Sequence, residues 1–424
     1  MEEIERADDH SERLLEESPP ADTSELVEIC RGAWPQTVVI FCRTLITVTD
    51  TAVLGRLGTD ELAAAAFANT WIQLTGAIIW SGCGEGMISL TSQAMGAENK
   101  ALTGLWLQTS MVGALFMCVP IGISWFFIGD ILEAVNMPTD SGEPISEIIR
   151  LSSVYGKMSI MWLLPDAATC VFCQWLNGLD VVKRTVVVHI FFVLYNLVAN
   201  IVFVHGIDVG MFQFEGIGFE GSPLATFSTT LLRLMVLVLT MRNRLPAGVY
   251  NGLTLESIRF DRLSVFLGQA IPNAMVSLLE QLQFVVLTLL MASFGKDQLA
   301  AHSSMMNVFD LFTAGIFGMS EGGAMKIGNQ LGAGRPKAAR ALSRVLFIAM
   351  GIMAMFVTLL FLGFRNYIGK IFSKDDQVIE YISQLAILVG MAYLLLTITF
   401  ASYATLQGQG RPEKAVLSMF FGGK

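Results

Sequence analysis

Long apolar segments recur along this chain, and each is long enough to cross a lipid bilayer. A spanning helix needs roughly 20 predominantly apolar residues, and inside lipid its backbone groups must hydrogen-bond one another. Ten such segments lie at about 33–55, 66–93, 104–128, 152–177, 185–205, 217–240, 263–294, 298–327, 342–363 and 380–407. Charged residues make up only 15% of the 424 residues, against about 25% in soluble domains. The sequence therefore predicts an all-α polytopic protein with ten complete helices in a lipid bilayer.

The loop charges predict which side of the membrane each loop occupies. Alternate loops hold thirteen Lys and Arg residues, at 94–103, 178–185, 241–262, 328–344 and 408–415. The remaining five loops hold six. Lys and Arg in short loops favour the cytoplasm, so the first set of loops and the amino terminus are predicted to be cytoplasmic.

The first residues of the chain are acidic and lack the apolar core and basic start of a signal peptide. We interpret residues 1–31 as an acidic cytoplasmic tail, of which 1–24 are expected to be disordered. The net charge of −9 gives no support to a nucleic-acid partner. Cys170 and Cys173 have CxxC spacing but no second pair to complete a zinc site, so no metal is predicted.

The segment from Leu263 to Phe294 carries one formal charge, Glu280, near its midpoint. A carboxylate at the centre of a span costs about 2.5 kcal/mol or more, so it is predicted to face a protected interior. Gln269, Asn273 and Ser277 precede it at helical spacing and share its stripe. We interpret Glu280 as part of an ion or substrate pathway. The alternative is a buried acid that a neighbouring helix satisfies for structure only.

Two stretches of the first half reappear in the second half. GTDELAAAAFAN from Gly58 aligns with GKDQLAAHSSMMN from Gly295, at an offset of 237. EGMISLTSQAMGAENKA from Glu85 aligns with EGGAMKIGNQLGAGRPKA from Glu321, at an offset of 236. Two copies of a six-helix unit would explain these offsets, and both copies would point the same way.

The repeat predicts two pseudo-symmetric six-helix lobes. We expect the first lobe at residues 32–240, a cytoplasmic linker at 241–262 and the second lobe at 263–424. The second lobe is predicted to be incomplete, because only AVLSMFFGGK follows Lys414 and this stretch is too short to span. Either truncation removed two helices or the protein ends without them.

These motifs resemble the multidrug and toxic compound extrusion family of secondary transporters. VTDTAVLGRLGTDELAA from Val48 is similar to the family's first-helix signature, and GNQLGAGRPKAAR from Gly328 to the Gly-rich turn of its second half. AIPNAMVSLLE from Ala270 resembles the seventh-helix motif of eukaryotic members, which puts Glu280 where their coupling glutamate stands. The resemblance implies twelve helices in two lobes, of which about ten are present here.

The same resemblance implies an ion-coupling site in the amino-terminal lobe. Asp50 matches the coupling acid of bacterial members, and Asn196 and Thr226 match an Asn and a Thr of that site. Asn200 stands where those members carry an Asp, so the implied site has one carboxylate. An amide can ligate a cation but cannot release a proton.

Other positions depart from the family pattern. Asn307 and Leu396 stand where animal members carry further acids. Ile88 replaces the acid usual in the second helix, and Glu85 lies three residues earlier. That shift is about one helical turn, so Glu85 is expected to reach the same cavity.

Five carboxylates are predicted inside the spans: Asp50, Glu85, Asp166, Glu280 and Glu321. Burial disfavours the charged form of a carboxyl group, so each is a candidate proton carrier. An organic cation that binds the ionised form would displace the proton. Competition of two ligands for one site, on either side of a rocking barrier, is the basis of antiport.

Two basic residues offer structural alternatives for these acids. Arg43 lies seven residues before Asp50 on nearly the same helical face, where it would hold Asp50 ionised as a structural partner. Lys326 lies in the same helix as Glu321 and would form a simple ion pair with it.

The sequence thus predicts a secondary antiporter that exports organic compounds, expected to be cationic, in exchange for protons or sodium ions. The coupling candidates are Glu280, Asp50, Asn196, Asn200, Thr226 and Glu85. The substrate-binding candidates are Glu280, Asn273, Gln281, Phe284 and Asn307. We expect a monomer in the plasma membrane or the vacuolar membrane.

Two other function classes are weighed against this one. A flippase of a lipid-linked precursor in a related transporter superfamily would need a basic central cavity, whereas the predicted spans hold more acid than base. A membrane enzyme would need catalytic residues, and a channel would need a ring of charged residues in its filter. The sequence offers no Ser–His–Asp set, metal cluster, Walker loop or charged filter ring. Neither an enzymatic activity nor a cofactor beyond the coupling ion is predicted.

Overall fold

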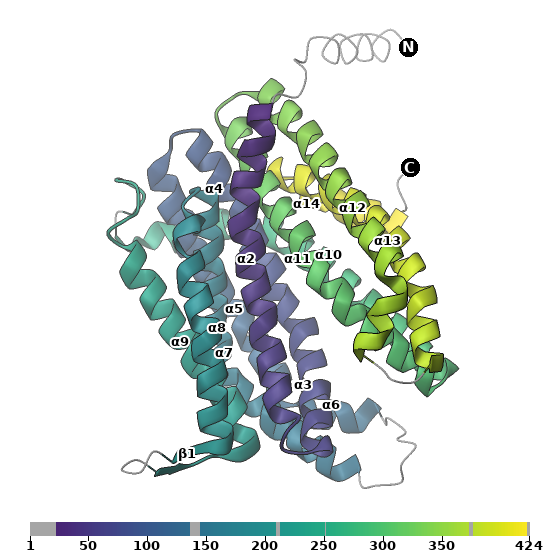
Figure 1. The fold of residues 1–424 in the computed structure, drawn as a ribbon. Coiled ribbons are helices and arrows are strands. Elements are labelled where there is room, and N and C mark those ends of the chain that lie inside the picture. The colour runs from purple at the N-terminus through teal and green to yellow at the C-terminus, as the bar shows by residue number, and fades with distance from the viewer. Residues whose placement is uncertain (1–22, 136–144, 209–212, 251, 373–375, 422–424) are drawn as a thin grey trace.

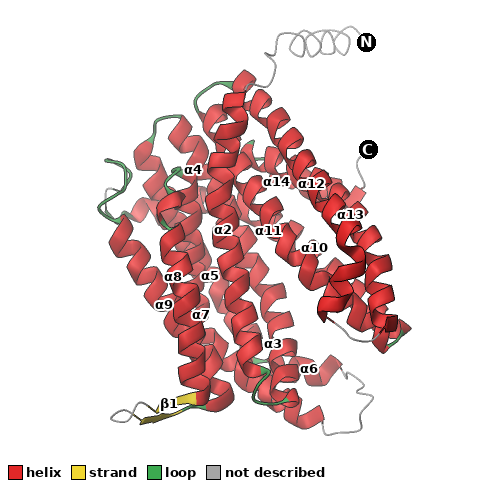
Figure 2. Cartoon of the chain, in the orientation of Figure 1, coloured by secondary structure: helices red, strands yellow, loops and turns green. Residues whose placement is uncertain are grey.

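The structure of the chain is a computed structural model that describes residues 23–135, 145–208, 213–250, 252–372 and 376–421. Within these ranges nearly all of the chain is helical, apart from one short hairpin and the connecting loops (Figure 2). The long helices lie side by side in a bundle (Figure 1). Most of the predicted acidic tail lies outside the described residues.

The amino-terminal half runs from α2 to α9. Its helices are α2 (Thr23–Leu54), α3 (Thr59–Ala77), the π-helix η1 (Ile78–Glu85), α4 (Gly86–Gly96), α5 (Lys100–Phe126), α6 (Ile128–Val135), α7 (Ile145–Gly178), η2 (Val182–Arg184), α8 (Val186–Asn200), η3 (Ile201–His205), η4 (Gly218–Glu220) and α9 (Gly221–Met241). Strand β1 (Gly206–Asp208) pairs antiparallel with β2 (Gln213–Glu215), with Ile207 opposite Phe214.

The carboxy-terminal half follows a loop that contains η5. Its elements are η5 (Leu255–Ile258), α10 (Phe260–Phe294), α11 (Lys296–Gly332), α12 (Pro336–Phe372), α13 (Asp376–Gly408) and α14 (Pro412–Phe421). Helix α10 continues through Pro272 without a break.

Each of the ten predicted spans lies, to within about one residue, inside one of these helices or inside consecutive ones. Among the described residues, eight of them are apolar enough along a continuous stretch to cross a membrane. The other two, α7 with 34 residues and α11 with 37, are long enough but carry more polar side chains. Those side chains include Gln174 and Glu321, which line a central pocket.

The buried apolar side chains form two clusters. One joins residues between Leu54 and Ala270. The other joins mainly residues between Val276 and Ala415, but it also contains Ile29 at the start of α2. Helix α2 therefore begins against the carboxy-terminal half and ends within the amino-terminal half. Figure 1 shows it between the group α7 to α9 and the group α11 to α13.

The beginning of α2 corrects one expected boundary. The tail was expected to extend to residue 31, whereas the helix begins at Thr23. Ile29 is fully buried, and Glu28 forms an ion pair with Lys326 of α11. Contacts with the carboxy-terminal half therefore stabilise the beginning of α2. The pattern of residues within one segment does not predict such contacts.

The two repeat stretches pack against each other in a symmetric way. A Cβ on Gly96 would collide with the carbonyl oxygen of Asn329, and a Cβ on Gly332 would collide with that of Gln93. Because Gly96 and Gln93 lie 236 positions before Gly332 and Asn329, the two contacts are one contact with the halves exchanged. This exchange is what a pseudo-twofold axis between the halves requires.

The loop between the halves lies on α5. The backbone carbonyl of Gly252 accepts a hydrogen bond from Gln108 at 2.8 Å, and the backbone N–H of Thr254 donates to the same side chain at 2.9 Å. Val249 of this loop is fully buried. The connection is therefore held to the amino-terminal half along much of its length.

Candidate functional site

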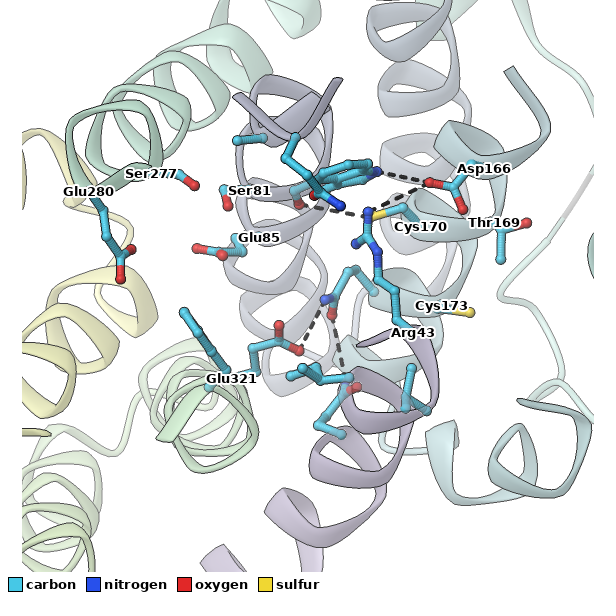
Figure 3. Close-up of a pocket in the computed structure, with 18 of the residues that line it drawn as sticks. Arg43, Ser81, Glu85, Asp166, Thr169, Cys170, Cys173, Ser277, Glu280 and Glu321 are labelled. Carbon is cyan, nitrogen blue, oxygen red and sulfur yellow. Dashed lines mark hydrogen bonds and ion pairs between the residues drawn. The ribbon is translucent and has the colours of Figure 1, made fainter. Parts of the chain in front are cut away.

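A pocket of about 220 Å³ lies where the two halves face each other. Its charged lining residues are Arg43, Glu85, Asp166, Arg233, Glu280 and Glu321. The amino-terminal half supplies the first four of these, and α10 and α11 supply the last two. In Figure 3 Glu280, Glu85 and Glu321 lie toward one side of the view, and Arg43 and Asp166 toward the other.

The π-helix η1 brings Glu85 to the pocket. Its sequence IIWSGCGE contains two glycines, and Gly82 lies so close to the backbone of Ala270 in α10 that a side chain would be crowded there. π-Helical turns inside α-helices are rare and often mark functional sites. Glu85 lines the pocket, whereas Ile88 is fully buried in the second apolar cluster.

Tyr403 of α13 connects the two halves at Glu85. Its hydroxyl lies within hydrogen-bonding distance of Glu85 Oε2 and 2.8 Å from Asn273 Oδ1. The hydroxyl has one proton to donate and can also accept. Glu85 therefore shares a hydrogen-bond network with α10 and α13 across the pocket.

Glu280 and Glu321 differ in their surroundings. Glu321 Oε2 accepts a hydrogen bond from Gln174 of α7 at 3.0 Å, so the amino-terminal half also reaches this acid. Glu280 lines the pocket and, among the described residues, takes part in no hydrogen bond or ion pair. Its stripe neighbour Ser277 lines the same pocket, and Gln269 donates to the carbonyl of Gly410 at 3.0 Å. The predicted polar stripe of α10 thus faces the protein interior.

Asp166 forms the centre of a second charged group. Arg233 Nη2 lies 3.0 Å from Asp166 Oδ1, and its side chain is 6% exposed. Trp80 Nε1 donates to Asp166 Oδ2 at 2.9 Å. Arg43 Nη2 lies 3.6 Å from the same Oδ2 atom, and its guanidinium stacks 3.8 Å from the centre of the Trp80 ring. The suggested pairing of Arg43 with Asp50 is therefore wrong for this structure.

Asp50 occupies a separate, buried polar site. Its Oδ1 atom accepts a hydrogen bond from Asn200 Nδ2 at 2.7 Å, and its Oδ2 atom accepts one from Thr226 at 2.8 Å. Asn200 Nδ2 also donates to the backbone carbonyl of Asn196 at 3.0 Å. The structure thus brings together α2, α8 and α9 at the four residues expected to converge.

Acceptor atoms around Asp50 remain without partners. The Oδ1 atoms of Asn196 and Asn200 are buried and accept no hydrogen bond from the described residues. Buried polar oxygens without a donor are unfavourable unless a proton, a water or a cation meets them. The site therefore combines one carboxylate with two buried amide oxygens that have no donor among the described residues.

The halves are closed against each other at the end where α2 begins. A Cβ on Gly318 would collide with Thr37, and a Cβ on Gly322 would collide with Ala33. Lys326 Nζ lies 3.0 Å from Asp180 Oδ2 in the loop after α7. Helices α2 and α11 separate toward the end that carries β1 (Figure 1). The pocket is thus sealed on one side of the bundle.

The ion pairs of Lys326 decide between the two alternatives for Glu321. A pair between Lys326 and Glu321 was one alternative, but Lys326 Nζ lies 3.0 Å from Asp180 Oδ2 and 3.3 Å from Glu28 Oε1. Lys326 lies five residues after Glu321, which turns the two side chains toward different helical faces. Glu321 therefore faces the pocket, and Lys326 lies at the sealed end.

The remaining predicted substrate residues divide between positions inside and outside the pocket. Gln281 lines it, and Asn273 contacts it through Tyr403. Phe284 is absent from the lining and packs on Phe309, with ring centres 6.0 Å apart. Asn307 is exposed and also outside the lining.

Three residues of the site, described below, were not predicted from the sequence. Arg233 is a single basic residue in an otherwise apolar span, so the rule that identified the carboxylates would have found it. Gln174 and Tyr403 carry no comparable signal, because neutral polar side chains are common in helix interfaces. Their role depends on the placement of α7 and α13.

Comparison with known proteins gives matches along most of the chain. A sequence model of the MatE family matches residues 35–202 and 272–422. Human Multidrug and toxin extrusion protein 1 is 26% identical over 382 residues, which cover 90% of this chain and 64% of that protein. Protein DETOXIFICATION 14 of Arabidopsis thaliana is 24% identical over 385 residues, which cover 90% of this chain and 76% of that protein.

The fold is also found among solved structures. The crystal structure of the eukaryotic MATE transporter AtDTX14 matches with a TM-score of 0.81 at 21% identity. The match covers 93% of this chain and 84% of that one. The helical membrane fold is therefore shared. This chain spans less than two thirds of the length of the human relative.

Proposed function

This chain belongs to the MatE family, and from that membership and the geometry of its pocket we propose that it exports organic compounds in exchange for protons or sodium ions. It is a multi-pass integral membrane protein. The proposal extends to this chain the activity that the human relative's name, Multidrug and toxin extrusion protein 1, gives to that protein. The family consists of transporters, and we propose no enzymatic activity.

The observation that carries the proposal is the pocket between the halves. It contains four carboxylates, two from each half, and Glu280 has no base bound to it in the described part of the chain. A carboxylate inside a membrane protein is costly unless it binds a proton or a cation. An organic cation and a proton would compete for such a group, and this competition couples their movements.

The Asp50 site supports a second place for the coupling ion. One carboxylate and two unpartnered amide oxygens suit a proton on Asp50 or a sodium ion shared by all three. This site shares no lining residue with the pocket, although Arg43 and Asp50 lie on the same helix. We propose that its occupancy influences the pocket through α2, which contacts both halves.

Movement between two states would follow from the way the halves meet. We propose that residues 32–240 and 263–424 act as lobes joined by the loop 241–262, and that they rock about the pocket. The contact between the repeat stretches seals the end where α2 begins. If that end is cytoplasmic, as the excess of Lys and Arg in its loops indicates, the described state faces outward.

A flippase of an anionic lipid-linked precursor is less well supported. A pyrophosphate group would need a predominantly basic cavity. The pocket instead contains four carboxylates and two guanidinium groups. The plasma membrane and the vacuolar membrane both remain suitable locations for the proposed exporter, and we propose that it acts as a monomer.

Transport in reconstituted vesicles tests the proposal. Purified protein is placed in vesicles with a fluorescent organic cation outside and an imposed proton or sodium gradient. We expect dye to accumulate against its own gradient, and the accumulation to collapse when an ionophore dissipates the driving ion. Equal accumulation in vesicles without protein, or in vesicles that carry no gradient, would contradict the proposal.

A further inference from the structure

The loop between the two halves carries large apolar side chains that the protein leaves uncovered. Leu253, Leu255 and Phe260 are 87%, 85% and 81% exposed, which are the largest fractions among the large hydrophobic residues that the structure describes. Ile258, which lies between them in the sequence, is 55% exposed. Exposed apolar side chains that gather in this way mark a contact with a protein or with a membrane. We call these four residues the loop surface.

The fold holds this segment in place with its apolar side chains turned outward. Gln108 of α5 binds the backbone of Thr254, as described above. Thr109 Oγ1, also of α5, lies 3.1 Å from the carbonyl oxygen of Ser257, and Ser257 is buried. Hydrogen bonds of the segment are therefore made on the side of α5, and the loop surface faces away from the protein.

The loop surface lies near the level where α9 and α10 leave the apolar part of the bilayer. Exposed apolar residues of α9 continue to Leu239, and Arg242 follows three residues later, about 4.5 Å farther along the axis. Phe260 is the first residue of α10, and Val265 in the next turn is again exposed and apolar. Figure 2 shows the loop after α9 at the end of the bundle where α2 begins. Both ends of the loop thus lie at the boundary between acyl chains and headgroups.

The start of the loop adds positive charge at this boundary. Arg242 and Arg244 are exposed and have no acidic partner within the described ranges. Arg184 of η2 is exposed as well, and its Nη1 atom donates to the backbone carbonyl of Arg244 at 3.3 Å. The two other arginines of the loop pair with acids of the same loop. Three guanidinium groups without counter-charge therefore lie close together beside the loop surface.

We propose that this loop is a membrane-binding element and that its partner is an anionic phospholipid. The loop surface enters the region of acyl chains next to the headgroups, and Arg184, Arg242 and Arg244 bind the negative groups of the headgroups. An apolar protein partner would cover the loop surface but leave the arginines without counter-charge. An anionic phospholipid supplies acyl chains and negative charge at the depths where the two sets of residues lie. The inference goes beyond the proposed export function and does not depend on it.

Quenching of a fluorophore on the loop tests the insertion. A dye is attached at Leu255→Cys, in full-length protein whose exposed Cys30 is replaced by Ser, in vesicles of phosphatidylcholine and phosphatidylserine. Ala333→Cys is the matched control, because Ala333 is exposed in the turn between α11 and α12 at the same end of the bundle. We expect spin-labelled lipid to quench the dye at position 255, and iodide on both sides of the membrane to quench the dye at position 333. Equal quenching by iodide at the two positions would overturn the insertion.

Removal of two arginines tests the class of lipid. Protein is extracted from vesicles that hold equal amounts of phosphatidylcholine and phosphatidylserine, and the lipids that remain bound are measured by mass spectrometry. We expect phosphatidylserine to be enriched, and its ratio to phosphatidylcholine to fall at least about fivefold in Arg242→Gln/Arg244→Gln, because each basic residue near the surface adds to the attraction of anionic lipid. Arg335→Gln/Arg340→Gln removes two exposed charges from the other half and should leave the ratio unchanged.

The outcomes decide the inference without reference to transport. A wild-type ratio in Arg242→Gln/Arg244→Gln would show that anionic lipid is not the partner. An equal fall in the control pair would assign the attraction to the basic end as a whole and overturn the loop as its site. A dye at position 255 that neither iodide nor spin-labelled lipid can quench would show that a protein surface, such as a second copy of this chain, covers the loop instead.

Discussion

Replacement of Glu280 by Gln separates a transport role from a structural role. Gln keeps the volume of the side chain and its hydrogen-bonding capacity but removes the charge. If Glu280 were paired with a buried base, the change would strand that base and cost about 3–5 kcal/mol. Within the described residues Glu280 has no such partner, and its side chain borders the pocket. We therefore expect the free energy of unfolding to change by less than about 1 kcal/mol.

The effect on transport should be much larger. A hydrogen bond to a charged group contributes about 1.5–3 kcal/mol, so loss of the carboxylate should weaken binding of an organic cation by about 10- to 150-fold. Glu280→Asp should retain part of the activity, because the charge survives on a shorter side chain. Gradient-driven dye accumulation and thermal unfolding are measured on the same preparations.

One result would refute this reasoning. A Glu280→Gln protein that unfolds like the wild type and accumulates the dye at the wild-type rate would exclude Glu280 as a coupling or binding residue. A large fall in thermal stability would instead indicate that Glu280 has a structural partner. In the first of these cases the coupling role would pass to Asp50.

Three other substitutions test separate parts of the structure. Asp50→Asn should abolish gradient-driven exchange in vesicles, because Asp50 supplies the one carboxylate among the four residues of its site, and wild-type exchange would contradict this. Arg233→Met should lower the free energy of unfolding by about 3–5 kcal/mol, since it breaks a pair whose side chains are 6% and 13% exposed, and denaturation should show no such loss in the exposed Arg242→Met control. Gly332→Val should lower the free energy of unfolding by about 1–3 kcal/mol, because a side chain there collides with the Gln93 carbonyl. Gly351→Val is the control, because a side chain at Gly351 enters open space. Equal stability of the two variants in denaturation would refute the contact between Gly332 and Gln93.

Hydropathy along the chain was sufficient to place the helices. All ten predicted spans are helical, because a bilayer permits few other structures for a long apolar segment. The stripe on α10 was also predictable, since one carboxylate within 32 apolar or neutral residues must face inward. The grouping of Asp50 with Asn200 and Thr226 followed from resemblance to a family rather than from spacing.

Contacts between helices could not be predicted from the spacing of residues along the sequence. Arg43 and Asp50 share a helical face, but seven residues separate them by about 10 Å along the axis, which is too far for an ion pair. Arg43 instead contacts Asp166 of α7, and Lys326 contacts Asp180. Both pairings depend on how α2, α7 and α11 pack together, which no single segment encodes.

Movement of the coupling ion tests the central claim most directly. Vesicles that contain the purified protein are loaded with an organic cation and diluted into medium without it, and the internal pH and the uptake of radioactive sodium are followed. If the protein is an exchanger, outward flow of the organic cation drives protons or sodium ions inward against their own gradient. Outward flow of the organic cation with no inward movement of either ion would contradict the claim.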